Sequence, residues 1–366
     1  MPPAATAAAA PARAGTAFHP LTVAAVEPLT DDAVAVTFDV PEELRATFAF
    51  DAGQSLTLRR MVDGVEQRRT YSICAAVGSR PRIGVREVPD GLFSRWLVHE
   101  MRPGDVVEVQ PPSGSFRADA TLLHARARHL CIAAGSGITP MLSIAASALA
   151  AGGEVTLLYG NRTTASVMFA EELADLKNAH PARFDLVHVL SREPRDVELF
   201  SGRLDPEQLR LLLGLLVPLE DVDQVWLCGP FAMTTAARDL LLELGVPAPR
   251  IHRELFFVDE PPPELHHRAA AITGVRSEVE VVLDGRRTTH VIPRDRPLLD
   301  AVQEHRGDLP FACKGGVCGT CRARLVRGEV DLVRNYALEP AEVEAGFVLT
   351  CQSYPRSEAL TVDFDA

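Results

Sequence analysis

Four cysteines near the end of the chain have the residue type and spacing to carry chemistry. Cys313, Cys318 and Cys321 follow the pattern C-x4-C-x2-C, and Cys351 comes thirty residues after the third. Four thiolates in this arrangement are the ligands expected for a 2Fe–2S cluster, and the glycines between them allow a loop to wrap closely around it. Such a cluster moves one electron at a time, so the rest of the chain should show where electrons enter and leave.

Cysteines can also bind zinc or form disulfides. Zinc knuckles favour two separate C-x2-C pairs, and only one pair here is that tight. Seven cysteines in 366 residues are too few for a chain held together by disulfides. Cys74, Cys131 and Cys228 stand alone, and we expect them to be buried as small apolar side chains.

The composition is that of an ordinary globular protein of two or three domains, with 47% hydrophobic and 23% charged residues in 366. A net charge of −12 argues against a nucleic-acid partner, and no apolar run is long enough to span a membrane. Residues 1–17 are rich in alanine and proline and do not resemble a signal peptide. We therefore expect a disordered tail on a cytoplasmic protein.

Short alternating runs separated by glycine and proline predict an antiparallel barrel over residues 18–120. Within it, Arg69-Thr70-Tyr71-Ser72 is predicted to be a strand, so Arg69 and Tyr71 share one face. An arginine beside an aromatic ring could hold the phosphate and the flat ring of a cofactor. The alternative is an ordinary barrel strand, because four letters are a weak pattern.

Gly91-Leu92-Phe93-Ser94 precedes a helix that the sequence predicts over residues 95–101. Free amides at the start of a helix suit a pyrophosphate, which makes Gly91 and Ser94 candidates for cofactor binding. The alternative is a simple helix start with Ser94 near the cap.

Residues 124–258 alternate between strand and helix patterns, which predicts a parallel sheet with crossover helices. A strand over 129–134 leads into the run G-S-G-I-T-P and then into a helix. Gly135, Gly137 and Thr139 thus lie where a backbone can approach a pyrophosphate closely. Proline replaces the third glycine of the ordinary dinucleotide fingerprint, so that fingerprint is not met.

Polar residues follow further strands of this region. Arg162 comes after a strand over 154–159, Ser191-Arg192 after a strand over 184–190, and Cys228-Gly229-Pro230 after a third. The carboxyl ends of parallel strands are where such sheets bind ligands. Solvated surface arginines are the alternative interpretation of Arg162 and Arg192.

A proline-rich, polar linker over 259–275 separates this region from a third domain over 276–366. There, alternating apolar residues reach an Asp284-Gly285 turn, which is a hairpin signal, and a helix is predicted over 298–305. Four arginines near the cysteines form either a solvated face or a basic docking surface for an acidic partner. They are Arg322, Arg324, Arg327 and Arg334.

Several motifs together resemble the ferredoxin–NADP reductase family. The resemblance implies a barrel that binds FAD rather than FMN, with Arg69 on the flavin phosphate and Tyr71 and Ser72 beside the isoalloxazine. The motifs are G-Q at 53–54, R-x-Y-S at 69–72, G-x-x-S at 91–94, P-x-G-x-F at 112–116, G-x-G-x-x-P at 135–140 and E-L-F at 254–256.

The same resemblance implies roles around the nucleotide. Ser191 and Arg192 are the residues implied for the adenosine 2′-phosphate, which favours NADPH over NADH. Cys228-Gly229-Pro230 is implied to lie near the nicotinamide. Phe256 either lies near the flavin, as the resemblance implies, or belongs to the core.

The third domain resembles the β-grasp of plant-type ferredoxins, including its closing ligand segment at Leu349–Gln352. The expected fold is therefore multi-domain β and α/β. It comprises an antiparallel flavin-binding β-barrel, a Rossmann-like nucleotide domain and a C-terminal β-grasp ferredoxin domain.

Nearly the whole chain resembles the reductase components of phenylacetyl-CoA epoxidase systems, on its domain order and on residues 18–23, 335–339 and 346–355. The resemblance implies that electrons pass from NADPH through FAD and a 2Fe–2S cluster to a separate di-iron oxygenase component. The alternative is the similar NADH-dependent reductase of Rieske-type oxygenases, such as ketosteroid hydroxylases. A third class, a non-catalytic iron–sulfur sensor or a zinc-binding protein, stays open.

Overall fold

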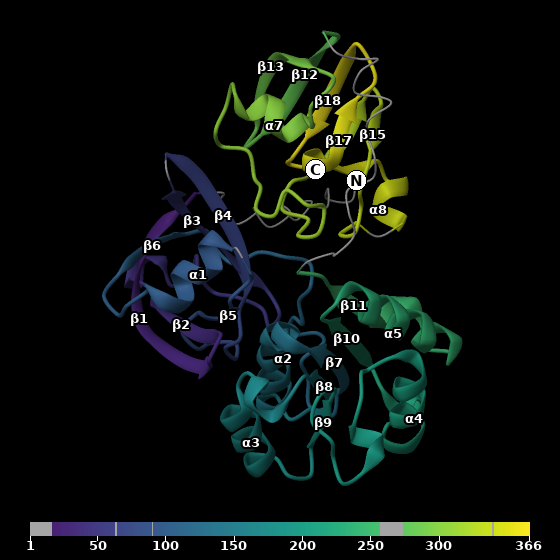
Figure 1. Ribbon diagram of the computed structural model, residues 1–366. Coiled ribbons are helices and arrows are strands. Elements are labelled where there is room, and N and C mark those ends of the chain that lie inside the picture. The colour runs from purple at the N-terminus through teal and green to yellow at the C-terminus, as the bar shows by residue number, and fades with distance from the viewer. Residues whose placement is uncertain (1–16, 63, 90, 257–273, 339) are drawn as a thin grey trace, which may run out of the picture.

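The structure is a computed structural model that describes residues 17–62, 64–89, 91–256, 274–338 and 340–366. The tail predicted over 1–17 and the linker predicted over 259–275 lie almost wholly outside the described residues. Figure 1 shows three lobes, one for each predicted domain. The lobe formed by residues 274–366 lies above the other two.

Six antiparallel strands form the first lobe, in the order β4-β3-β6-β1-β2-β5. A bridge between Ile73 and Ile83 joins the end of β4 to β5, so the sheet closes on itself as the predicted barrel. Inward side chains such as Phe38 and Leu56 are fully buried in its core. The strands are β1 (His19–Thr30), β2 (Ala33–Asp39), β3 (Ser55–Val62), β4 (Val65–Ser72), β5 (Arg82–Arg86) and β6 (Val106–Val109), with helix α1 (Leu92–His99) beside β5.

Five parallel strands form the second lobe, in the order β11-β10-β7-β8-β9, which confirms the predicted α/β domain. The chain moves outward in opposite directions from β7, so the carboxyl ends of β7 and β10 form a topological switch point, where such sheets bind ligands. The strands are β7 (Arg128–Ala134), β8 (Glu154–Asn161), β9 (Phe184–Leu190), β10 (Gln224–Cys228) and β11 (Ile251–Glu254), and the helices are α2 (Ile138–Ala150), α3 (Ala170–Ala179), α4 (Pro206–Leu216) and α5 (Phe231–Glu243).

The third lobe is a mixed five-stranded sheet in the order β13-β12-β18-β14-β16. The predicted hairpin is confirmed, because Asp284 and Gly285 both have positive φ, as its tight turn requires. The elements are β12 (Arg276–Leu283), β13 (Arg286–Pro293), α7 (Leu298–Gln303), β14 (Arg322–Arg327), β15 (Val330–Leu332), α8 (Pro340–Glu344), β16 (Phe347–Leu349), β17 (Ser353–Pro355) and β18 (Ala359–Asp363).

The first two lobes share one hydrophobic core. Barrel residues such as Ala33 and Phe116 belong to the same buried cluster as Met141 of α2 and Phe169 before α3. The Phe116 ring meets the Trp226 ring of β10 edge to face at 5.3 Å. The third lobe has an apolar core of its own, whose buried members all come from residues 279–364.

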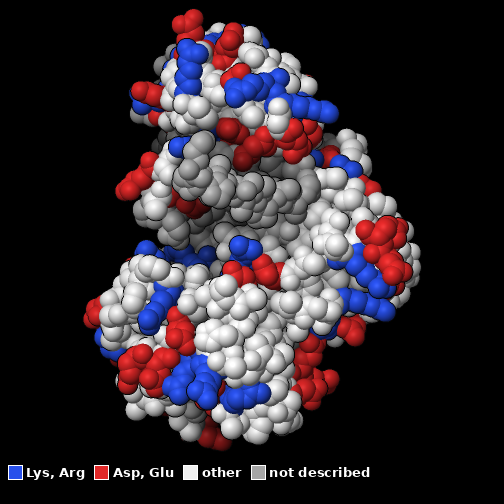
Figure 2. Space-filling view, turned by 180° about the vertical axis from the view of Figure 1, so that it is seen from behind, with Lys and Arg blue, Asp and Glu red and all other residues white. Residues whose placement is uncertain are grey.

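Charged side chains of both signs are interspersed over the face seen in Figure 2. Ion pairs also join the first two lobes. Arg82 of the barrel forms ion pairs of 2.7 and 2.8 Å with Glu27 of the barrel and Glu172 of α3. No helix among the described residues is long and apolar enough to cross a membrane.

Candidate functional site

Strand β4 presents the predicted flavin residues on two faces. Arg69 is exposed, and Tyr71 lies on the same face, part-buried against the Phe93 ring of α1 at 6.2 Å. Burial raises the pKa of the Tyr71 hydroxyl, so the side chain stays neutral. A permanent cation and a flat ring therefore stand side by side on an antiparallel strand, which is a donor set suited to a phosphate and a planar cofactor.

Helix α1 begins three residues earlier than the sequence predicts, at Leu92, with Gly91 at its N-cap. Ser94 is consequently inside the first turn and does not cap the helix. Its hydroxyl accepts a hydrogen bond from the Val88 amide at 3.0 Å and donates one to the Gly91 carbonyl at 3.2 Å. The helix starts earlier because residues 92–94 are already helical after Gly91, and no side chain caps that start.

Ser72 ends β4 and reaches into the second lobe. It is 3% exposed, and its hydroxyl donates to the Glu254 carboxylate at 2.9 Å. Glu254 lies beside Cys228 in the parallel register of β10 and β11. Although Glu254 as a residue is only part-buried, its carboxyl is shielded from water, and this burial raises its pKa to about 8. Burial also raises the pKa of the Cys228 thiol, with the Glu254 charge adding to the effect.

The backbone approaches itself very closely at the switch point. A Cβ added to Gly137 would lie 2.2 Å from the Cys228 carbonyl oxygen, so only glycine fits there. Gly135 has a φ of +55°, and its carbonyl accepts a hydrogen bond from the Tyr159 hydroxyl at 3.0 Å. Thr139 is buried and donates to the Ser136 carbonyl at 3.0 Å. The three predicted residues of this loop thus shape its backbone at the start of α2, the kind of place where a pyrophosphate binds.

The predicted phosphate residues of the second lobe lie together at one edge of the sheet. The Ser191 amide donates to the Asn161 carbonyl at 2.9 Å, and the Arg192 amide donates to the Arg162 carbonyl at 2.8 Å. These bonds continue the β8–β9 pairing past the strand ends and place both arginine side chains, which are exposed, at the carboxyl edge. The nicotinamide candidates Gly229 and Pro230 lie at the same edge, after β10.

Phe256 is 39% exposed and belongs to no core of the described residues, so the interpretation as a core residue is wrong. It follows β11 directly, two residues after Glu254, at the edge that carries Cys228. An exposed ring at that point is available to a flat ligand, which leaves the other interpretation as a prediction.

The four clustered cysteines of the third lobe approach in two pairs. Cys313 lies beside Cys318 and Cys321 lies beside Cys351, close enough for the thiols of each pair to shift one another's pKa. Cys318 is also close enough to Cys321 for their charges to interact. The Gly315 amide donates to the Cys313 sulfur at 3.3 Å, and Gly316 and Gly319 have positive φ.

This donor set suits two irons better than one ion. Among the described residues, no three His, Cys, Asp or Glu side chains surround a single point as one metal ion requires. Four clustered thiols, with a backbone amide on one sulfur, instead match the four thiolates that hold a 2Fe–2S cluster. Cys74, Cys131 and Cys228 are buried and apart from these pairs, as the sequence predicts.

Two residues important to this arrangement are not among the predicted site residues. Glu254 carries a weak signal, an acidic residue at the end of a strand beside the predicted nucleotide edge. Arg68 precedes the predicted flavin strand motif, and its side chain is buried between the first and third lobes. The period-two alternation of a strand places Arg68 on the face opposite Arg69, but it does not show what covers that face.

Comparison with known proteins gives each lobe a match. The family model described as an oxidoreductase FAD-binding domain matches residues 20–118, an oxidoreductase NAD-binding domain matches 131–239, and a 2Fe-2S iron-sulfur cluster binding domain matches 281–356. The chain is 42% identical over 355 residues to one of the subunits of the 1,2-phenylacetyl-CoA epoxidase of Escherichia coli, across 96% of this chain and 99% of that one.

The chain belongs to the family of oxygenase reductases. Another member, the ferredoxin reductase component of 3-ketosteroid-9-alpha-monooxygenase from Rhodococcus rhodochrous, is 36% identical, with 94% of this chain and 96% of that one covered. Phthalate dioxygenase reductase has the same architecture, with a TM-score of 0.58 and 25% identity over 95% of this chain and 98% of its own. This oxygenase reductase is thus an NAD(P)H-dependent oxidoreductase that transfers electrons through FAD and a 2Fe–2S cluster.

A further structural match concerns a longer protein. An intact type IV self-sufficient cytochrome P450 monooxygenase aligns with a TM-score of 0.67 and 25% identity over 94% of this chain. The oxygenase reductase spans 41% of that chain. The three-lobed arrangement therefore also occurs as part of a larger polypeptide.

Proposed function

We propose that this reductase delivers electrons from NADPH to the di-iron oxygenase component of a phenylacetyl-CoA epoxidase system. The observation that carries the proposal is the 42% identity over 96% of the chain to the E. coli epoxidase protein, against 36% for the ketosteroid reductase. The segments that resemble epoxidase reductases lie in the first and third lobes, at residues 18–23, 335–339 and 346–355. The proposal places the chain in the cytoplasm, where cysteine thiols stay reduced.

The proposed binding residues fall into three sets. FAD would be held by the barrel, with Arg69 on a phosphate and Tyr71 and Ser72 beside the flavin ring. A nicotinamide nucleotide would lie along the carboxyl edge of the second sheet. The barrel set also includes Gly91 and Ser94; the nucleotide set comprises Gly135, Gly137, Thr139, Arg162, Ser191, Arg192, Cys228, Gly229, Pro230 and Phe256; the cluster set comprises Cys313, Cys318, Cys321 and Cys351.

The chemistry belongs to the cofactors, since a flavin accepts two electrons as a hydride and releases them singly to a one-electron acceptor. The chain's own residues place the groups. Ser72 and Glu254 join the barrel to β11 at the position proposed for the two rings, and the 3% exposure of Ser72 means that this hydrogen bond itself is shielded from water. No catalytic acid–base set is proposed.

The nucleotide preference is tested by Arg192→Ala. An exposed arginine at the carboxyl edge suits the 2′-phosphate that only NADPH carries, and a charge-assisted contact of this kind contributes about 1.5–3 kcal/mol. We expect KM for NADPH to rise about ten- to a hundredfold while KM for NADH changes little. Equal changes in KM for NADPH and NADH in steady-state kinetics would instead mean that Arg192 is a solvated surface residue that does not bind the 2′-phosphate.

The proposed docking face for the oxygenase surrounds the cysteine loop. Arg324, three residues after Cys321 on β14, is exposed there, whereas Arg327 is exposed at the far end of the strand, beside Glu278 and Glu358. Arg322 is less available, because it forms a 3.2 Å ion pair with Glu342 and lies over the Phe347 ring at 3.9 Å. Long-range charge mainly steers association, and it is screened over about 8–10 Å at physiological ionic strength. Coupled turnover should therefore fall with salt more than dye reduction does.

The deciding experiment mixes the purified chain with two acceptors. One is a purified phenylacetyl-CoA oxygenase complex, and the other is a Rieske-type oxygenase, with product followed by mass spectrometry. We expect oxygenated phenylacetyl-CoA from the first mixture and none from the reductase alone. Efficient turnover only with the Rieske enzyme would overturn the epoxidase proposal and favour the ketosteroid-type alternative.

A further inference from the structure

Arg68 is a buried arginine between two lobes. Its side chain is only 4% exposed, and arginine is almost never fully buried without partners. It lies on β4 next to Arg69, and the alternation of the strand turns the two side chains to opposite faces. One face of β4 thus carries the proposed flavin residues Arg69 and Tyr71, while the other meets the third lobe at Arg68 and the second lobe at Ser72.

The Arg68 guanidinium contacts the segment that leads into the cysteine loop. Its Nη1 donates to the Leu309 carbonyl at 3.2 Å, and the group lies over the Phe311 ring at 4.0 Å. Phe311 is two residues before Cys313, the first proposed cluster ligand. A guanidinium satisfies both partners at once, because it donates in its plane and stacks with its face.

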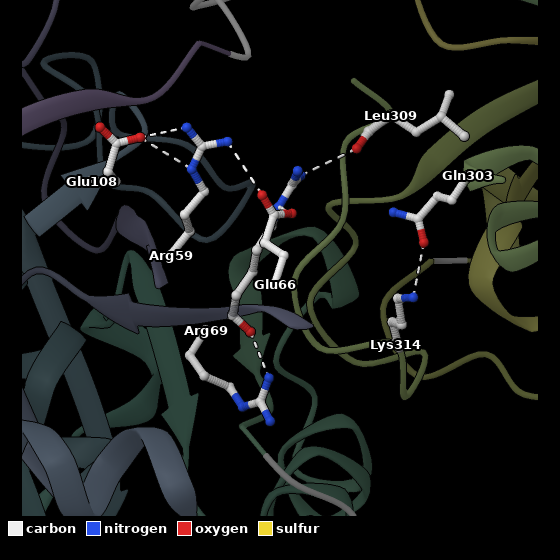
Figure 3. A network of polar contacts seen from close by, with 8 residues as sticks. Arg59, Glu66, Arg69, Glu108, Gln303, Leu309 and Lys314 are labelled. Atoms are coloured by element: carbon white, nitrogen blue, oxygen red, sulfur yellow. Dashed lines mark hydrogen bonds and ion pairs between the residues drawn. The ribbon is translucent and has the colours of Figure 1, made fainter. Parts of the chain in front are cut away.

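Barrel residues also contact the Arg68 side chain and fix its position. Its Nε donates to the Glu66 carboxylate at 2.7 Å. Glu66 also accepts from Arg59 at 3.3 Å, and Arg59 in turn donates to Glu108 of β6 at 3.1 Å, so three strands are linked in one chain of ion pairs (Figure 3). Phe18 adds a ring 5.0 Å from the Arg68 guanidinium. This network limits the positions that the Arg68 side chain can take.

We propose that Arg68 is a positioning residue for electron transfer, which docks the cysteine loop against the strand that holds the flavin. The step concerned is the transfer of one electron from the reduced flavin to the oxidised cluster, in which no bond forms or breaks. The inference rests on the flavin-to-cluster path and does not depend on which oxygenase receives the electrons.

The interface offers few other contacts that could set this distance. No apolar cluster of the described residues joins the barrel to the third lobe, since the cores of the two contain only their own residues. The third lobe touches the second through the Phe231 and Tyr336 rings, 5.3 Å apart. Electron transfer slows steeply with separation, so loosening the Arg68 contact should slow it.

The test uses the full chain with its cofactors, in the variants Arg68→Leu and Phe311→Leu. In an anaerobic stopped-flow instrument, the rate constant of flavin reduction by NADPH and the NADPH concentration that half-saturates it should stay at the parental values. Reduction of the cluster should slow about tenfold in Arg68→Leu, because losing a hydrogen bond from a charged group depopulates the docked arrangement by about that factor, and by less in Phe311→Leu. The double variant should be little worse than Arg68→Leu, since both remove the same contact.

A second readout does not need turnover. Amide hydrogen exchange over residues 305–313 should speed up in both variants, with and without bound cofactors, while exchange over β7 and β8 stays unchanged. The midpoint potential of the cluster should not move, which separates misplacement from damage to the cluster. Arg68→Lys should restore only part of the rate, because an ammonium cannot stack and donate in the same plane.

The matched control is Arg80→Leu, which removes an arginine that is 68% exposed and paired with Asp39 at 2.9 Å. It should change neither cluster reduction nor exchange. Arg68 is adjacent to Arg69, the proposed flavin-phosphate residue, so Arg68→Leu could also lose FAD. In that case Phe311→Leu, which removes the contact from the third lobe, tests whether the contact positions the cysteine loop. Parental cluster reduction together with parental exchange in Phe311→Leu would overturn the proposal, whatever oxygenase the chain serves.

Discussion

The barrel meets its two neighbours in different ways. Towards the second lobe it shares a hydrophobic core, and Gly84 of β5 lies so close to the other lobe that an added Cβ would be 2.6 Å from the Thr139 methyl and 2.8 Å from the Phe169 ring. Towards the third lobe it offers one buried arginine, which meets a carbonyl and a ring of that lobe. Burial of apolar side chains thus holds the first interface, and polar and cation–π contacts of one arginine hold the second.

The difference matches what each interface must do. Hydride transfer requires two rings in near contact, which a close-packed shared core can maintain. Transfer to the cluster moves only an electron, and the cluster must also serve an external partner. A polar contact of a few groups opens at lower free-energy cost than a shared apolar core. We therefore expect changes at the second-lobe interface to affect stability and flavin reduction, and changes at the third-lobe interface to affect only the output of electrons.

The largest expected effect is on electron transfer to the oxygenase, with flavin reduction left intact. Cys318→Ser removes one of the four proposed cluster ligands, so transfer to the oxygenase should be lost completely. Flavin content and NADPH-driven reduction of a soluble dye should persist, because the proposed flavin and nucleotide residues all precede residue 257. Cys74→Ser is the matched control, since a hydroxyl can keep the hydrogen bond that the Cys74 thiol donates to the Arg82 carbonyl at 3.3 Å. Parental oxygenase turnover in Cys318→Ser would contradict the ligand assignment.

The next effect tests the shared core with Gly84→Ala. The added methyl must displace Thr139 or Phe169, both of which are buried, and overpacking of this kind costs about 1–3 kcal/mol. We expect a lower melting temperature and slower flavin reduction by NADPH, measured by calorimetry and stopped flow.

Gly214→Ala is the control for Gly84→Ala. It makes the same change inside α4, where an added Cβ meets nothing within 4 Å, so it should stabilise the chain by about 0.5–1 kcal/mol. If Gly84→Ala also stabilises the chain, the first two lobes are not packed as tightly as the structure shows.

A smaller effect concerns pH and Glu254. Burial raises the pKa of its carboxyl from 4.5 to about 8 in the folded chain, so between these values the folded state binds a proton that the unfolded state has released. The free energy of unfolding should therefore fall as pH rises from about 4.5 to 8, and be independent of this group below that range. Glu254→Gln should flatten that part of the stability profile, measured by denaturant unfolding. An unchanged slope would mean that the carboxyl is ionised when folded.

The smallest expected effect concerns the other contact of the third lobe. Tyr336→Leu removes the edge-to-face contact with Phe231, which contributes about 0.5–1.5 kcal/mol. Cluster reduction should slow about two- to tenfold, with flavin reduction unchanged in the same stopped-flow traces. A larger loss than in Arg68→Leu would show that the docking of the cysteine loop depends mainly on the second lobe.

The sequence by itself determined the features that depend on neighbours along the chain. Cysteine spacing indicates the cluster, period-two alternation places Arg69 and Tyr71 on one face, and an Asp284-Gly285 pair predicts a hairpin whose positive φ values the structure confirms. These signals are local, because ligand geometry, strand pleat and turn conformation are all set within a few residues. The start of α1 was misplaced by three residues, since apolar Leu92 carries no cap signal.

Only the tertiary structure decided which distant residues meet. Ser72 and Glu254 are 182 positions apart and share a hydrogen bond, and Arg68 and Leu309 are 241 positions apart. Phe256 could be core or exposed from its sequence, and it is exposed because β11 ends at Glu254 and the chain then leaves the sheet. The burial of a charged group, and hence the raised pKa of Glu254, depends on how whole domains pack, which spacing along a chain does not encode.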